Sequence, residues 1–137
     1  NRDNTDYGDF MTDLLAYLEE TLTIAEAAGI KKERIILDPG VGFGKTYEQN
    51  LTVIRKLDRL CALGYPVLLA ASRKSVIGNT LNLSAEHRVE GTVATTVMGV
   101  ERGASFVRVH DVKENLRAVK MTEAILAAAS ESEKGDR

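Results

Sequence analysis

Apolar residues recur at three- and four-residue spacing from Phe10 to Ala28, and this period predicts an amphipathic helix that ends at Gly29. Short all-apolar runs follow, and a helical pattern succeeds each of them. Continuous apolar runs are typical of strands that are buried on both faces of a parallel sheet. We therefore predict three parallel strands, at Ile35–Leu37, Val67–Ala70 and Phe106–Val109.

The predicted helices begin at capping residues and end at glycines. Thr46 and Gln49 have capping-box spacing, so we expect a helix from about Tyr47 to Leu63 that Gly64 ends. A short helical or loop segment is expected from Ser72 to about Gly78. A helix capped by Ser84 is expected over about Ala85–Arg102. A last helix, to about Ala129, is expected to begin at Asp111 and Glu114, which have capping-box-like spacing.

The expected helix over Ala85–Arg102 carries small residues nearly all round. Small side chains let another backbone approach closely, so we interpret this helix as a packing seam. The seam faces either a second subunit or, alternatively, the sheet of the same fold. The small residues are Gly91, Thr92, Ala94, Thr95, Thr96 and Gly99.

Alternation of strands and helices predicts the α/β class with a parallel sheet. Two architectures compete, an open doubly wound sheet and part of an eight-stranded barrel. A whole barrel takes about 250 residues, and this chain has 137. The pattern favours the open sheet for a complete chain and the barrel for a fragment.

Composition narrows the class of protein. A net charge of −2 without a basic stripe argues against nucleic acid or an anionic membrane as a partner. The apolar runs are too short to span a bilayer, and the N-terminus does not have a signal-peptide pattern. The single cysteine, Cys61, fits a cytoplasmic protein and is expected to pack in the core. The chain does not begin with Met, which predicts that it starts inside a larger protein.

Each predicted strand ends in a polar cluster. Because parallel strands bring their carboxyl ends to one rim, an acid, three bases and a histidine should converge on one pocket. The first cluster, Asp38–Thr46, matches neither the phosphate P-loop nor the dinucleotide glycine spacing. Asp38 can accept two N–H donors from a flat heterocycle, and Phe43 can cover such a ring as a mobile lid. A purely structural turn is the alternative.

The other two clusters are basic. Ser72–Ser75 places two cations and two hydroxyls beside an expected helix N-terminus, which favours an anion over a solvated turn. Strand alternation puts Arg108 and His110 on one face, where they can hold a phosphate or pyrophosphate. A hydrogen-bonded core histidine is the alternative for His110, and His87 is expected at the surface.

The sequence does not contain metal-ligand spacing. It does not indicate a nucleophilic triad either. Ser72 or Ser75 can be imagined as a partner of His110, but no sequence feature selects that pairing.

Taken in order, these clusters resemble the successive signatures of the dihydropteroate synthase family, over about Asn1 to Ala127. Four signatures in register are specific, although Ala70-Ala71 stands where the family usually has a glycine. The resemblance implies an α/β fold class, the C-terminal portion of a (β/α)8 TIM barrel from the helix of unit five to unit eight. Residues 1–129 would form the partial pterin-binding domain and residues 130–137 a frayed tail. The signatures are Asp38-Pro39-Gly40 with Gly42-Phe43-Gly44-Lys45, Gly64-Tyr65-Pro66-Val67-Leu68, Ser72-Arg73-Lys74-Ser75 and Arg108-Val109-His110-Asp111-Val112.

The resemblance implies a transferase of folate biosynthesis, the class that sulfonamides target. Enzymes of this class join 6-hydroxymethyl-7,8-dihydropterin pyrophosphate to p-aminobenzoate and release pyrophosphate. As catalytic residues the resemblance implies Asp38 and Lys74 on the pterin ring, with Arg108 and His110 on the departing pyrophosphate. The implied substrate-binding residues are Gly42, Phe43, Arg73 and Ser75. Phe43 and the Arg73 stem would wall the p-aminobenzoate ring, and Ser75 would hold its carboxylate.

The resemblance also implies Mg²⁺ as a cofactor, with ligands mainly from the other half of the barrel and from the pyrophosphate. A homodimer through the late helices is implied as well. Two alternatives stay open, a pterin-binding methyltransferase barrel and a truncated barrel half without catalytic activity. If the chain is truncated, we expect it to be inactive alone.

Overall fold

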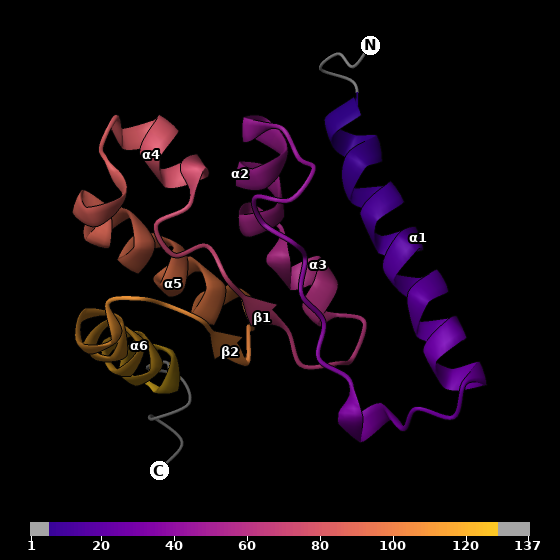
Figure 1. Cartoon of the computed structure of the whole chain (residues 1–137). Helices are drawn as coiled ribbons and strands as arrows, with labels where there is room; N and C mark the ends of the chain where they lie inside the picture. The colour runs from indigo at the N-terminus through magenta and orange to yellow at the C-terminus, as the bar shows by residue number, and fades with distance from the viewer. Residues whose placement is uncertain (1–5, 129–137) are drawn as a thin grey trace.

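The computed structural model describes residues 6–128, with side chains from Phe10 onward. Figure 1 shows α1 along one edge of the molecule and α6 at the other, with the strands between them. The elements in chain order are α1 (Asp6–Ala27), η1 (Lys32–Arg34), α2 (Tyr47–Arg55), α3 (Leu57–Cys61), β1 (Leu68–Leu69), α4 (Ser75–Leu81), η2 (Ala85–His87), α5 (Val89–Arg102), β2 (Phe106–Val107) and α6 (Val112–Ala127).

The three predicted strands are parallel neighbours, although each is shorter than predicted. β1 pairs with β2 in the register Leu68 to Phe106 and Leu69 to Val107. Leu37 forms a single parallel bridge with Val67, so the first strand is reduced to one residue. The chain turns directly after this bridge, where Gly40 N–H donates to Asp38 Oδ1 at 2.8 Å.

The two faces of the sheet differ in burial. Leu37, Val67 and Leu69 are buried in the core that the helices build. Ile36 and Phe106 are 54% and 48% exposed, so the expectation of strands buried on both faces is wrong at these two positions. Successive strand side chains point to opposite faces, and in residues 6–128 the core lies against only one of them.

The capping box predicted at the start of α2 is confirmed. Thr46 Oγ1 accepts from Gln49 N–H at 3.1 Å, and Gln49 Oε1 accepts from Thr46 N–H at 2.9 Å. The predicted single helix is divided, because Lys56 (φ −107°, ψ 26°) separates α2 from α3. Gly29 and Gly64 adopt the left-handed conformation expected of helix stops, at φ 85° and 91°.

The helix boundaries around α4 and α5 differ from the prediction. α4 continues through Gly78 and ends before Asn82, which takes the left-handed conformation. Gly78 serves packing instead of termination, because a Cβ there would lie 2.2 Å from Nη2 of Arg88. The expected helix over Ala85–Arg102 divides into η2 and α5, and Ser84 makes no side-chain capping bond.

The small residues of α5 support close packing within the fold. A Cβ at Gly91 would lie 2.3 Å from Ile77 Cγ2 of α4, and one at Gly99 would lie 2.7 Å from Leu69 Cδ2 of β1. Thr92 and Thr96 are buried on the same helix. Gly99 therefore matches the alternative interpretation, packing on the sheet of the same fold, whereas Gly91 packs on the helix α4.

The remaining expectations concern single features of the chain. His87 is exposed, as predicted. Cys61 is a free cysteine that packs against the core, and its partial burial, with the nearby Asp58 carboxylate, raises the pKa of its thiol. Residues 129–137, which include the expected frayed tail, lie outside the described part. Between residues 6 and 128 no helix has the length and apolarity to cross a membrane.

Candidate functional site

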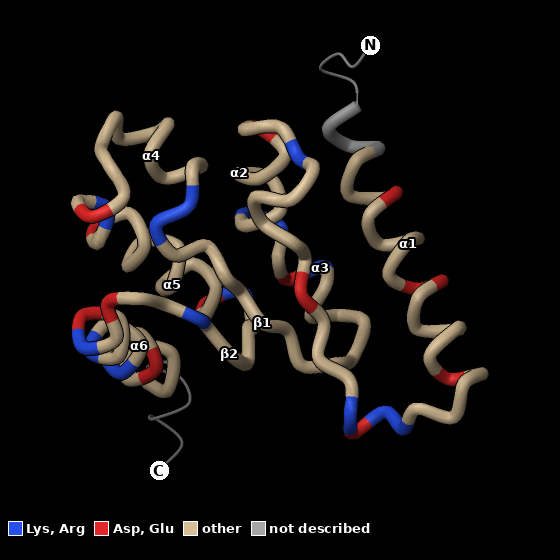
Figure 2. The backbone as a smooth tube through the Cα atoms, in the orientation of Figure 1, with Lys and Arg blue, Asp and Glu red and all other residues tan. Residues whose placement is uncertain are grey.

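A pocket of about 340 Å³ opens where β1 and β2 end. It is lined by Ala70, Ser72, Lys74, Arg108, Val109 and His110. Arg108 and His110 are two residues apart and both line it, as strand alternation predicts. Figure 2 shows basic positions on the segment that leads into α4 and directly after β2. The chain thus brings a lysine, an arginine and a histidine to one hollow.

Lys74 is held at the pocket by the glycine-rich loop. Its ammonium donates to the backbone oxygen of Val41 at 2.6 Å and lies 4.9 Å from the centroid of the Phe43 ring. Partial burial lowers the pKa of Lys74; the Asp38 carboxylate opposes this shift and Arg108 adds to it. The Phe43 side chain is 70% exposed. Lys74, which lines the pocket, therefore lies beside the exposed Phe43 ring, where a flat ligand can contact both.

Lys45 belongs to the same loop and binds two of its backbone oxygens. Its ammonium donates to Gly40 O at 2.9 Å and to Phe43 O at 3.2 Å. Partial burial lowers the pKa of Lys45, Asp38 opposes the shift, and Lys74 adds to it. Gly42 N–H donates to Asn50 Oδ1 of α2 at 2.9 Å, which anchors the loop to that helix.

Asp38 is exposed and does not line the pocket, although its charge acts on Lys74 inside it. Gly42 fits close to that lysine, because a Cβ added there would lie 3.1 Å from Lys74 Cδ. Ser75 is exposed and is the first residue of α4. The predicted roles of Asp38, Gly42 and Ser75 remain predictions.

Arg73 sits in a tightly held turn. Its φ of 58° lies in the left-handed region, which costs free energy for a residue with a Cβ. Its N–H donates to Thr92 Oγ1 at 3.1 Å, and its carbonyl oxygen accepts from Arg88 Nη1 at 2.7 Å. Two residues at the start of α5 thus hold this turn between β1 and α4.

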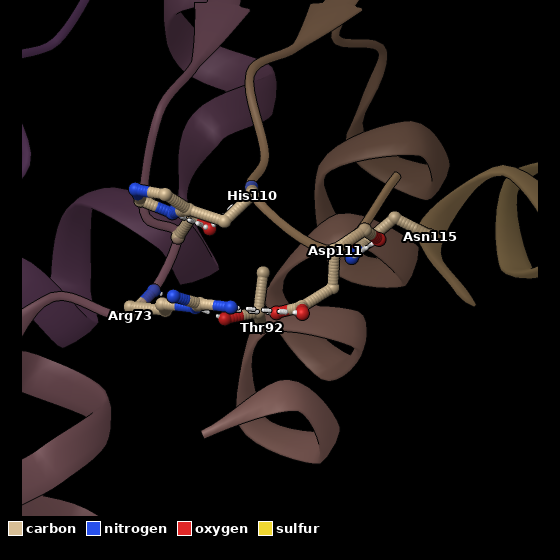
Figure 3. A network of polar contacts seen from close by, with 6 residues as sticks. Arg73, Thr92, His110, Asp111 and Asn115 are labelled. Carbon is tan, nitrogen blue, oxygen red and sulfur yellow. Dashed lines mark hydrogen bonds and ion pairs between the residues drawn. The ribbon is translucent and has the colours of Figure 1, made fainter. Parts of the chain in front are cut away.

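The side chain of Arg73 pairs with Asp111, as Figure 3 shows. Nη2 lies 3.0 Å from Oδ1 and Nε lies 3.4 Å from Oδ2. This hydrogen-bonded pair raises the pKa of Arg73. Asp111 occupies the N-cap position of α6 without a side-chain capping bond, so the expected capping box is wrong. A two-pronged bond to a guanidinium outcompetes a single backbone N–H for that carboxylate.

Two buried polar residues support Asp111 from the helices. Asn115 Nδ2 donates to Asp111 O at 2.8 Å, and Thr96 Oγ1 donates to Asn115 Oδ1 at 2.7 Å. Asn115 is 1% exposed, so this chain of bonds crosses the buried contact between α5 and α6. It fixes the start of α6, which directly follows the pocket residue His110, and Figure 3 shows Asp111 and Asn115 there.

Ser72 is a site residue that the sequence did not select. Its Oγ lies 2.6 Å from His110 Nδ1 and accepts the His110 backbone N–H at 2.9 Å. The register of β1 and β2 would have predicted this contact. Leu68 pairs with Phe106, 38 positions later, and Ser72 and His110 have the same separation. That register is not visible in the sequence.

The described residues do not suit a magnesium site. Residues 6–128 lack a group of three or more His, Cys, Asp or Glu side chains that could hold a metal ion. The Asp111 carboxylate is paired with Arg73, and Asp38 accepts from Gly40 N–H. A Mg²⁺ ion would need its oxygen ligands from elsewhere.

Comparison with known proteins identifies the class to which this fold and site correspond. The model of the pterin binding enzyme family matches residues 1–110, and the chain belongs to that family.

Within the family, curated proteins similar to this chain include dihydropteroate synthases from several bacteria. The one from Clostridium beijerinckii is 61% identical over 127 residues, which cover 92% of this chain and 47% of the relative. The one from Bacillus subtilis is 51% identical over 126 residues, or 92% of this chain and 44% of the relative. The chain therefore spans about half the length of the relatives it matches.

Solved structures agree with the sequence comparison. Dihydropteroate synthase from Clostridium difficile in the presence of pteroic acid matches with TM-score 0.85 and 50% identity, over 93% of this chain and 47% of that chain. The Coxiella burnetii enzyme in complex with pteroic acid matches with TM-score 0.88 and 37% identity, over 93% and 49%. The fold is thus an α/β partial domain with parallel strands that corresponds to about half of these enzymes.

Proposed function

We propose that this chain supplies one half of a dihydropteroate synthase site. The complete site joins 6-hydroxymethyl-7,8-dihydropterin pyrophosphate to p-aminobenzoate and releases pyrophosphate. One observation carries the proposal most directly: Lys74, Arg108 and His110 line the same pocket at the carboxyl ends of parallel strands. Ligands of barrels with parallel strands bind at that end.

In the proposed mechanism, Arg108 and His110 hold oxygens of the departing pyrophosphate. Positive charge and N–H donors aimed at a leaving group stabilise the negative charge that develops on it. The C–O bond to the pterin methylene can then break early, and the aniline nitrogen attacks the cationic methylene. No step is assigned to a metal through residues of this chain.

The pterin ring is assigned to Asp38 and Lys74. The exposed carboxylate of Asp38 would accept the ring N–H and amino donors, and Lys74 would contact the ring from its opposite edge. The Asp38 charge opposes the lowering of the Lys74 pKa, which supports the assignment of both groups to one ligand. Binding would compete with the bond from Lys74 to Val41 O.

p-Aminobenzoate is assigned to the entrance of the pocket. Phe43 and the stem of Arg73 would wall its ring, with Gly42 leaving room, and Ser75 would hold its carboxylate. The bonds of Arg73 to Asp111 support a fixed stem, because they hold the guanidinium in one place.

We also propose that the chain is the part of a (β/α)8 barrel from the helix of unit five to unit eight, with residues 1–129 as its partial domain. The missing half would bring the ligands of Mg²⁺. The isolated chain should be inactive, because the bare sheet face at Ile36 and Phe106 leaves the substrate site open to solvent.

A chimera tests the proposed activity. The part of Clostridium beijerinckii dihydropteroate synthase that this chain does not cover is joined to the chain, and pyrophosphate release is measured with both substrates. We expect turnover from the chimera, dependent on p-aminobenzoate, and none from the chain alone. A folded chimera without turnover, beside an active parent enzyme, would refute the proposal. Turnover by the isolated chain would refute its status as a half site.

The homodimer is a separate proposal. An apolar groove between α2, α4 and α5, lined in part by Leu51, Leu81 and Ala94, offers a surface for a second copy. Sedimentation of the chimera over a concentration series should give the mass of two chains. A mass of one chain at all concentrations would remove this proposal.

A further inference from the structure

We propose that Ser72 is a positioning residue that fixes His110 in the tautomer with its proton on Nε2. The imidazole then presents an N–H donor to an anion in the pocket. The inference rests on the proposed function only for the identity of that anion, pyrophosphate. The tautomer itself follows from the contacts of two side chains.

The hydroxyl of Ser72 makes two bonds to the same residue. The backbone N–H of His110 can only donate, so Ser72 Oγ is the acceptor of the bond at 2.9 Å. The second contact joins Oγ to His110 Nδ1 at 2.6 Å. In this second bond either atom is able to be the donor, and the surroundings decide which one is.

The surroundings favour the hydroxyl as donor. Ser72 is 8% exposed, and across residues 6–128 its hydroxyl has no acceptor other than Nδ1. If Nδ1 carried the proton, Oγ would accept two bonds, and its own hydrogen would have no acceptor among residues 6–128 and would depend on solvent in the pocket that Ser72 lines. A hydroxyl that donates to Nδ1 instead has partners within the chain for both its hydrogen and its lone pair. The Ser72 O–H therefore donates to Nδ1.

This direction determines the chemistry of the other ring nitrogen. A neutral imidazole carries one proton, so an accepting Nδ1 places it on Nε2. His110 shares the pocket with the cations Lys74 and Arg108. A donor on Nε2 adds to their attraction for an anion, whereas a lone pair there would repel its oxygens. Ser72 thus makes the neutral histidine suitable for the same ligand as the two cations.

The pairing of the strands sets this arrangement. Ser72 follows β1 and His110 follows β2, at the separation of 38 positions that also relates Leu68 to Phe106. A shift in register by one residue would move His110 to the other face. The register of the two strands therefore determines the tautomer, because it brings Ser72 to His110.

Nitrogen NMR tests the tautomer directly. The chain is labelled with ¹⁵N-histidine, and the ring nitrogens are observed at about pH 8, where an unperturbed imidazole is neutral. A His87→Gln variant, changed at an exposed residue outside the pocket, assigns the two histidines. We expect His110 to show an unprotonated Nδ1 and a protonated Nε2. A protonated Nδ1 would overturn the inference, whatever the chain binds, and this measurement on the unchanged chain needs no Ser72 variant.

Binding of inorganic pyrophosphate tests the consequence. By calorimetry we expect Ser72→Ala to weaken binding by about 3- to 10-fold, the effect of losing one hydrogen bond, and Ser72→Thr to retain most of it. Ser72→Ala should also allow protonated Nδ1 to appear in the spectrum. If Ser72→Ala changes neither the tautomer nor the affinity, Ser72 is not a positioning residue. If His110 has the expected tautomer and no variant binds pyrophosphate, the tautomer is upheld and the proposed function fails.

Discussion

The guanidinium of Arg73 and the carboxylate of Asp111 lie 3.0 Å apart and join two segments separated by 38 residues. The two residues are the chain neighbours of the pocket residues Lys74 and His110, and their pairing ties the turn before α4 to the start of α6. We expect Asp111→Ala to lower the free energy of unfolding only slightly, since both side chains are partly exposed and solvent screens their attraction. Urea denaturation measures the change.

A double-mutant cycle isolates the pair from any helix-capping effect. Arg73→Ala, Asp111→Ala and the double variant should show a small favourable coupling free energy between the two side chains. Additive effects of the two single changes would show that the pair does not contribute to stability.

Substitution of Gly91 tests the packing of α5, because the sign of the change in stability depends on the space beside this residue. In an open helix position, Gly→Ala stabilises by about 1 kcal/mol. At Gly91 the new Cβ would meet Ile77 Cγ2 at 2.3 Å, so we expect Gly91→Ala to destabilise the chain by about 1–3 kcal/mol. Ala94→Gly at an exposed position of the same helix is the control for propensity. Stabilisation by Gly91→Ala would contradict the packing of α5 against α4.

Local patterns in the sequence predicted the alternation of helices and parallel strands, although two predicted helices are divided and η1 was not predicted. The capping box at Thr46 and the stops at Gly29 and Gly64 are decided by residues a few positions apart. The three apolar runs likewise marked the parallel strands. These features depend on the chain near each residue, which is why they could be predicted.

The predictions that were wrong concern features that depend on contacts between residues distant in sequence. A short helical or loop segment was expected to end near Gly78, but α4 continues through this residue, whose space is filled by Arg88. Asp111 was expected to cap α6, but Arg73 competes for its carboxylate. The bond from Ser72 to His110 follows from the strand register, which only the folded chain fixes. In the site, residue types were predictable and their pairings were not.

Lys45 leads to a prediction about pH. Burial lowers its pKa below 10.5 in the folded chain, so between that lowered pKa and 10.5 the unfolded chain binds more protons. The free energy of unfolding therefore gains from this group as the pH rises through that interval. Neutral Lys45 can still donate to Gly40 O and Phe43 O, which keeps the loop intact.

Comparison with Lys45→Met measures this contribution. The stability of the unchanged chain minus that of Lys45→Met should become more favourable as the pH rises toward 10.5. Lys120→Met, at an exposed position of α6, serves as the control. A difference that falls with rising pH would show that the ammonium is stabilised, not penalised, by its surroundings.

The most direct test of the central claim is calorimetric binding of inorganic pyrophosphate to the chain and to its Arg108→Ala and His110→Ala variants. Each lost charge-assisted bond is worth about 1.5–3 kcal/mol, so Arg108→Ala should weaken binding by roughly 10- to 100-fold. His110→Ala should weaken it by a smaller factor, and His87→Gln should leave it unchanged. Equal affinity of all four proteins for pyrophosphate would contradict the assignment of the pocket.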